Sequence, residues 1–295
     1  MALRIGINPI TWSNDDLPEL GGDTPLETCL AETSQAGYVG IELGNKFPRE
    51  SAALRPILDR HGLALISGWY SGRLLERTAE AEIRAVEAHL RLLSDMGCGV
   101  MVFAETTGSV AGARGTPVTR RPRITDAQWP VFTERLTRVA DHLAKRGVRM
   151  AYHHHMGTVI ETEAEIDRLI RSTGESVGLL LDTGHLTYAG AEPAAVARRH
   201  IARINHVHCK DVRPSVLAAM RKGDRSFLDS VVEGVFTVPG DGAVDFSAML
   251  GVLKDARYAG WLVVEAEQDP VKAHPLTYAR MGYDYLSGAV RRIGL

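Results

Sequence analysis

Eight short apolar runs recur along the chain, and this repeat limits the fold more than any other feature of the sequence. Segments with helical periodicity separate the runs. Continuous apolar strands joined through helices are typical of a parallel sheet that helices cover. Eight such units in one chain predict a closed (β/α)8 TIM barrel. The predicted strands span residues 3–8, 39–44, 63–68, 99–105, 148–153, 177–182, 204–210 and 261–267.

Helix signals between the runs support this repeat. Thr24, Thr125 and Thr162 each stand three residues before Glu or Gln, which predicts a capping box at each position. The segment 76–96 is predicted to be a helix that packs against the barrel, because its apolar residues fall on one face. These apolar residues are Ile83, Val86, Leu90 and Leu93.

An open doubly wound sheet is the alternative fold. It is disfavoured because no G-x-G-x-x-G follows the first strand and no phosphate-binding G-K-[ST] loop occurs. With no evident linker, we expect one catalytic domain over residues 1–295. Two connections, 106–123 and 211–242, exceed the usual length of roughly two to six residues. Each is a candidate lid or a contact in a homo-oligomer.

Composition excludes several partners. The chain has 34 Lys+Arg against 36 Asp+Glu, so it lacks the basic excess that a nucleic-acid ligand requires. No apolar run approaches the about 18 residues that suggest a membrane span, and the first residues do not resemble a signal peptide. Three cysteines are too few for a disulfide framework. We therefore expect a cytoplasmic protein with a small-molecule substrate.

Polar side chains gather at the carboxyl ends of the last four predicted strands. In a barrel these ends meet at one mouth, where active sites form. Side chains alternate across a strand, so every second residue faces the same side. Residues that share a face are His153 with His155, His206 with His208 and Lys210, and Glu265 with Glu267, while Asp182 and His185 come from the sixth strand and its tip.

This convergence predicts a divalent metal of the Mn, Co or Zn type. A single buried histidine is more often a hydrogen-bonded core residue, and that is the interpretation we prefer for His154. Core packing does not explain the carboxylates at the ends of the sixth and eighth strands, because burying them without a cation is costly.

Further residues are candidates for substrate binding. Trp12 and Trp69 follow predicted strands and can form an apolar wall against a sugar-like ring, or pack as ordinary rim residues. Glu42 is a candidate for binding substrate hydroxyls, although a solvated carboxylate is the commoner outcome. Glu267, on the same face as Glu265, is the fourth candidate. Cys209 should face outward as a structural thiol.

Several motifs together resemble the inosose dehydratases, within the xylose-isomerase-like barrel superfamily. The resemblance extends over nearly the whole chain, and it implies a (β/α)8 barrel that removes water from 2-keto-myo-inositol to give a trihydroxycyclohexane-1,2-dione. It also implies dependence on Mn²⁺ or Co²⁺ and an association with glutathione. The motifs are YHHHMGT (152–158), LLLDTGHLTYAG (179–190), INHVHCKDVR (204–213), FTVPGDGAVDF (236–246) and GWLVVEAEQDP (260–270).

The resemblance also implies a metal-ligand set. The superfamily pattern places Glu, Asp, His and Glu on the last four strands, and three of these positions correspond to Asp182, His208 and Glu265. The strand-five position holds His153 instead of Glu. Either His153 replaces that ligand, or His155 does, or the metal keeps an open position.

Dehydration beside a ketone needs a base for the alpha proton and an acid for the leaving hydroxyl. We expect His155 or His185 to be the base, and Lys210 or the other histidine to assist the leaving oxygen. Three other functions remain open: a metal-dependent ketose isomerase or epimerase, a metal-dependent nuclease, and a sugar-binding protein without catalysis.

Overall fold

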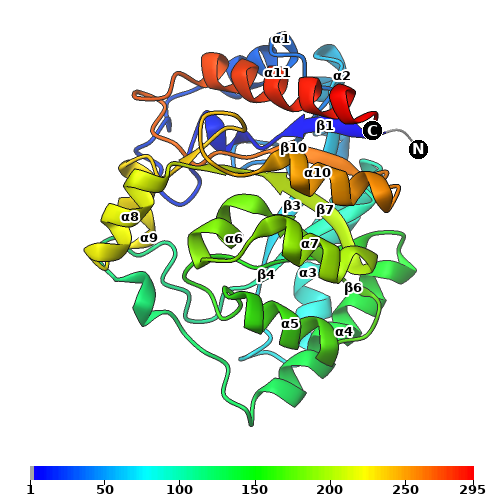
Figure 1. Ribbon diagram of the computed structural model, residues 1–295. Coiled ribbons are helices and arrows are strands. Elements are labelled where there is room, and N and C mark those ends of the chain that lie inside the picture. Colours follow the sequence, from blue (N-terminus) through cyan, green and yellow to red (C-terminus); the bar gives the residue numbers. More distant parts are fainter. Residues whose placement is uncertain (1–2) are drawn as a thin grey trace.

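The computed structural model describes residues 3–295 and contains the closed eight-stranded barrel predicted from the sequence (Figure 1). All neighbouring barrel strands are parallel, in the order β1-β10-β7-β6-β5-β4-β3-β2, and β1 pairs with β2 to close the ring. The barrel strands are β1 (Arg4–Ile7), β2 (Gly40–Leu43), β3 (Ala64–Gly72), β4 (Val100–Glu105), β5 (Arg149–His153), β6 (Val177–Asp182), β7 (Ile204–Cys209) and β10 (Trp261–Val264).

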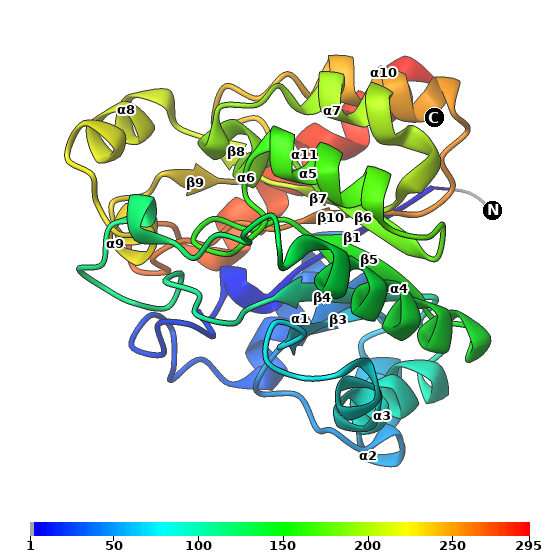
Figure 2. The ribbon, with the colours of Figure 1, turned by 90° about the horizontal axis from the view of Figure 1, so that it is seen from below.

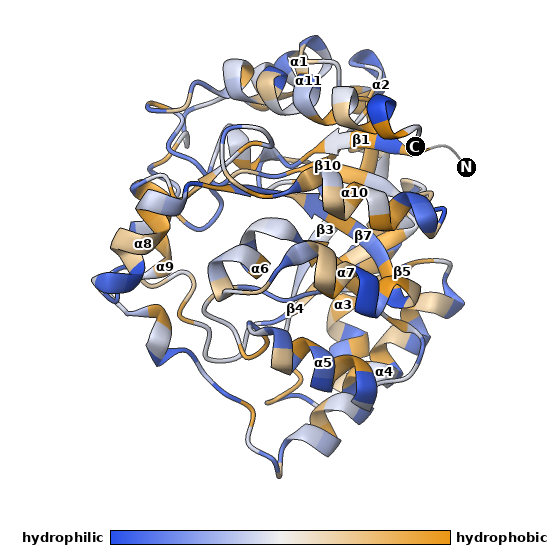
Figure 3. Ribbon diagram, viewed as in Figure 1, coloured by the Kyte–Doolittle hydropathy of each residue, from blue (hydrophilic) through white to orange (hydrophobic). Residues whose placement is uncertain are grey.

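A ring of helices surrounds these strands (Figures 1 and 2). Figure 3 shows that hydrophobic residues concentrate on the strands, while the outer helices carry many hydrophilic ones. This distribution is expected when a parallel sheet is buried on both faces. The surrounding helices are α1 (Leu26–Gln35), α2 (Ser51–Arg60), α3 (Ala79–Asp95), α4 (Trp129–Lys145), α5 (Glu163–Ser172), α7 (Pro193–His200), α10 (Phe246–Asp255) and α11 (Pro275–Ile293).

Of the three predicted capping boxes, only the one at Thr162 is confirmed. Its side chain accepts the N–H of Glu165, whose carboxylate accepts the N–H of Thr162. The other two predictions are wrong. Pro25 is the N-cap of α1, because its restricted φ suits the extended conformation there, and α4 begins only at Trp129. The Thr125 hydroxyl instead donates to the Gln128 side chain at 2.8 Å.

The helix predicted over residues 76–96 is α3, which begins after Thr78 as its N-cap. Val86, Leu90 and Leu93 are fully buried on its inner face, as the apolar spacing predicts. Gly97 follows the helix with φ +81°, a conformation that glycine adopts without strain.

The two long connections lie beside each other at the end of the barrel opposite the chain termini (Figure 2). Residues 106–123 contain one 3-10 turn, η2 (Val118–Arg120), and Pro117 pairs with Ser226 of the second connection. Residues 211–242 are not an irregular loop. They form β8 (Asp211–Val212), α8 (Pro214–Lys222), α9 (Phe227–Val232) and β9 (Phe236–Thr237), and β8 pairs with β9.

Three short elements complete the chain: η1 (Pro9–Thr11), α6 (Thr183–Ala189) and η3 (Ile201–Arg203). Cys29, Cys98 and Cys209 are buried and unpaired. Across residues 3–295, every helix is too short or too polar to cross a lipid bilayer.

Candidate active site

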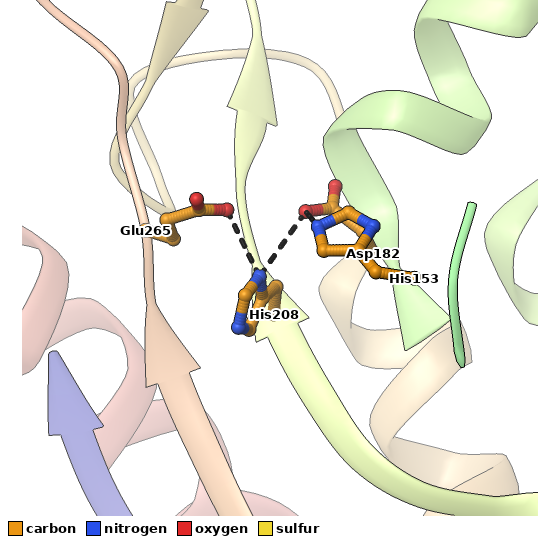
Figure 4. A group of neighbouring side chains, drawn as sticks. All are labelled: His153, Asp182, His208 and Glu265. Carbon is orange, nitrogen blue, oxygen red and sulfur yellow. Dashed lines mark ion pairs between the residues drawn. The ribbon is translucent and has the colours of Figure 1, made fainter. Parts of the chain in front are cut away.

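Four side chains at the carboxyl ends of β5, β6, β7 and β10 point toward one another (Figure 4). One potential ligand atom from each of His153, Asp182, His208 and Glu265 lies within 4.8 Å of the others. His208 Nδ1 lies 3.0 Å from Glu265 Oε2 and 3.5 Å from Asp182 Oδ2, and His153 Nε2 lies 3.6 Å from Asp182 Oδ2. The structure thus brings together the four predicted ligands, which we call the metal group.

The metal group is suited to a divalent cation. Among the described residues, Asp182 Oδ2, His208 Nδ1 and Glu265 Oε2 are buried and have no hydrogen-bond partner of suitable geometry. His153 donates its Nδ1–H to the backbone oxygen of His154 at 2.6 Å, which directs the unprotonated Nε2 into the group. Two imidazoles and two carboxylates form a donor set that binds Zn, Co or Mn.

The electrostatics of His208 support this interpretation. Burial alone would lower its pKa, but the carboxylates of Glu42 and Glu265 raise the pKa of His208 well above its usual value. The surrounding charges therefore favour a positive charge at this position, which a metal cation would supply.

Glu42 lies deeper in the barrel, between two histidines of β7. His206 Nε2 is 2.8 Å from Oε1 of Glu42, and His208 Nε2 is 3.2 Å from Oε2. Asn8 donates to Oε2 at 2.7 Å, and Ser67 donates to Oε1. Burial would raise the pKa of Glu42, but the facing histidines lower it below its usual range. The carboxylate is therefore ionised and enclosed by donors.

The metal group and the group of Glu42, His206 and His208 are the first two clusters of polar side chains. A third cluster lies on the other side of the metal group and contains His155, His185, Lys210 and Glu267. The ammonium of Lys210 is 2.8 Å from Glu267 Oε1 and 3.0 Å from both His185 Nε2 and Glu265 Oε2. His155 Nε2 is 3.9 Å from Glu267 Oε1, and its ring centroid lies 4.0 Å from that of His185. The structure brings the predicted catalytic residues together in this cluster.

Burial sets the protonation of the third cluster. It raises the pKa of Glu267 to about 7, so this carboxyl can hold a proton near neutral pH. Burial and the Lys210 ammonium lower the pKa of His155, which keeps its imidazole neutral. An acid and a base thus lie beside each other, the arrangement that general acid-base catalysis requires.

A cavity of about 400 Å³ opens onto these groups. Its lining includes His208 and Glu265 from the metal group and His155 and Glu267 from the third cluster. His185 and Lys210 do not line it, and both are fully buried behind the cavity wall. Direct contact with a substrate is therefore open to His155 and Glu267 in this structure, and not to His185 or Lys210.

The structure separates the two tryptophans. Trp69 lines the cavity, is 41% exposed and lies edge-on to His153 and His155. Trp12 does not line the cavity. It is buried in the hydrophobic core and its indole N–H donates to Glu32 at 2.6 Å. We therefore do not retain Trp12 as a substrate-binding candidate.

His154 is buried and accepts the backbone N–H of Asp182 through Nε2, so it lies outside all three clusters.

Sequence reasoning missed several polar residues of the cavity. Their positions at or beyond the ends of the first five predicted strands were the available signal, since barrel sites form at strand ends. The missed residues are Asn8, Asp15, Asp16, Asn45, Arg49, Ser71, Thr106, Ser109 and Thr158.

Comparison with known proteins assigns the family. Residues 30–287 match the model of the xylose isomerase-like TIM barrel family. The rhizopine catabolism protein MocC of Rhizobium meliloti is 56% identical over 97% of this chain and 88% of its own length. The inosose dehydratase of Geobacillus thermodenitrificans is 44% identical over 96% of both chains.

Solved structures agree with this fold. The crystal structure of the IOLI protein with a zinc atom aligns over 99% of both chains with a TM-score of 0.70 and 17% identity. The chain belongs to the xylose isomerase-like TIM barrel family, and within this family it is similar to inosose dehydratases over nearly its full length.

Proposed function

We propose that the chain is a metal-dependent hydro-lyase that removes water from 2-keto-myo-inositol, giving a trihydroxycyclohexane-1,2-dione in myo-inositol catabolism. The observation that supports this most is the metal group beside His155 and Glu267 in one cavity, in a chain with full-length similarity to inosose dehydratases. The enzyme acts in the cytoplasm as one catalytic domain.

His153, Asp182, His208 and Glu265 hold the metal, which we propose to be Mn²⁺ or Co²⁺. The IOLI protein, which shares the fold, binds a zinc atom, and this supports a divalent cation. When bound, the cation polarises the ketone oxygen and stabilises the charge that develops on loss of the alpha proton. Glutathione, which the family resemblance implies, is a further proposed cofactor without a contact assigned to it.

His155 takes the alpha proton. Its Nδ1–H donates to the backbone oxygen of Met156 at 2.8 Å, so Nε2 is the unprotonated nitrogen of this cavity-lining residue. Glu267 protonates the leaving hydroxyl, for which its raised pKa suits it. The buried Lys210 and His185 hold these two groups in place. Trp69 covers the substrate ring, and polar lining residues such as Asn8 bind its hydroxyls.

A second candidate is a step of rhizopine catabolism, because MocC shares more identity with the chain than the inosose dehydratase does. The same base, acid and metal group would serve a dehydration there. Turnover of 2-keto-myo-inositol compared with turnover of rhizopine breakdown products distinguishes the two candidates.

The direct test is incubation of the purified protein with 2-keto-myo-inositol and Mn²⁺, followed by ultraviolet absorbance and mass spectrometry. Dehydration gives an absorbing product whose mass is lower by one water. An isomer of unchanged mass would instead identify a ketose isomerase or epimerase. Tight binding without turnover would identify a sugar-binding protein, and tight DNA binding would favour a nuclease.

A further inference from the structure

We propose that Glu42 is a positioning residue for the metal: it orients the His208 ring so that Nδ1, rather than Nε2, faces the ion. This inference rests on the metal group of the proposed function. It gives Glu42 a role different from substrate binding, which the sequence had suggested for this residue.

The two nitrogens of His208 face different carboxylates. Nδ1 lies 3.0 Å from Glu265 Oε2 and 3.5 Å from Asp182 Oδ2, inside the metal group. Nε2 lies 3.2 Å and 3.3 Å from the two oxygens of Glu42, on the opposite side of the ring. The Glu42 carboxylate can only accept, so Nε2 carries a proton. Nδ1 faces the carboxylates of the metal group, so it is the nitrogen that offers its lone pair when a cation occupies that group.

Glu42 is itself held rigidly. It is only 2% exposed, and three donors besides His208 converge on its carboxylate. They come from different parts of the barrel: Asn8 after β1, Ser67 on β3 and His206 on β7. Although Glu42 contributes to the cavity lining, both oxygens are already hydrogen-bonded, so little capacity is left for a substrate hydroxyl.

Partners of this kind change metal affinity through the ligand. A carboxylate behind a ligating imidazole fixes the ring orientation and raises its basicity, and loss of such a partner typically costs about 10- to 100-fold in affinity. The carboxylate of Glu42 contacts both His206 and His208. One side chain therefore fixes the orientation of two histidines of β7, and one of them, His208, belongs to the metal group.

The test compares Co²⁺ binding by the full-length wild-type protein and Glu42→Gln, measured by competition with a chelator and by the visible absorption of the bound ion. Glutamine keeps the shape but loses the charge. We expect about 10- to 100-fold weaker binding and a changed absorption spectrum, because His208 is less tightly oriented. Ser67→Ala, which removes one donor to Glu42, should weaken binding in the same direction but less. It serves as the test if Glu42→Gln does not fold.

Glu82→Gln is the matched control. Glu82 is also fully buried and accepts three hydrogen bonds, from Tyr70, Arg77 and the backbone of Arg73, but it belongs to α3 outside the site. It should bind Co²⁺ as the wild type does. Wild-type affinity and spectrum in both Glu42→Gln and Ser67→Ala would overturn the positioning role. Wild-type protein that binds no Co²⁺ would overturn the metal group itself, so the two failures are distinguishable.

Discussion

Lys210 donates to Glu267 at 2.8 Å in a region where both side chains are almost completely excluded from solvent. The same ammonium lies 3.0 Å from Glu265, a member of the metal group. Lys210 therefore joins the proposed ion site to the proposed acid. Since each carboxylate would be costly to bury alone, the lysine charge is part of what keeps both in the barrel mouth.

Lys210→Met should strongly destabilise the protein. Methionine retains much of the apolar stem but removes the charge, which leaves two buried carboxylates uncompensated in the metal-free protein. Removing one member of a buried ion pair costs about 3–5 kcal/mol, and denaturant unfolding would measure the loss. Lys222→Met, on the exposed end of α8, is the control and should change stability little. Equal stability of the two variants would contradict the role of Lys210.

His155→Ala should lower kcat by about 10²- to 10⁴-fold, the contribution expected of a general base. The metal content should be unchanged, because His155 lies outside the metal group. Turnover is measured with bound metal quantified in the same sample. His142→Ala, on the outer helix α4, should leave kcat unchanged. Near wild-type turnover of His155→Ala with metal bound would exclude His155 as the base.

Removal of the metal with a chelator should abolish dehydratase activity, and Mn²⁺ or Co²⁺ should restore it. Metal should also raise the melting temperature, since a ligand at 100 times its Kd stabilises the folded state by about 2.7 kcal/mol. Asp182→Asn, which weakens one oxygen ligand, should need more metal for the same shift. Full activity in protein shown by elemental analysis to lack divalent metal would contradict the proposal.

The sequence predicts the barrel well because an apolar run marks each of its eight strands. The prediction is less accurate at strand ends. The third run was expected to end at Gly68, but β3 continues to Gly72 because residues from Trp69 onward pair with β4. Tertiary pairing thus extends a strand through residues whose own pattern is ambiguous. In the last strand the reverse occurs, and Glu265 lies just beyond β10.

The candidate site is predictable where it depends on alternation along a strand. His153, His208 and Glu265 converge because each occupies the inward face at the same end of its strand. Alternation along a strand does not predict contacts across the barrel interior. Glu42 reaches His206 and His208 although β1 and β10 separate β2 from β7 in the ring, so that contact depends on how the closed barrel is staggered.

Arg121→Ala should destabilise the protein and displace the segment that carries His155. Arg121 is 5% exposed; its guanidinium pairs with Glu165 at 2.7 Å and Glu161 at 3.2 Å, and donates to the backbone oxygen of Thr158. Loss of a partner from a buried ion pair costs about 3 kcal/mol or more. We expect a lower free energy of unfolding together with a raised KM, because the segment that begins at His155 loses its charged attachment to residues 106–123 and keeps only the hydrogen bonds from Ser109 and Val110 to Gly157.

Arg114→Ala is the matched control on the same connection. Arg114 pairs with Asp229 at 3.1 Å, but its side chain is 53% exposed, so its loss should cost at most about 1 kcal/mol. Denaturant unfolding and steady-state kinetics of the two variants separate a buried attachment from a surface pair. If Arg121→Ala and Arg114→Ala change stability and KM equally, the cluster around Arg121 does not hold the His155 segment in place.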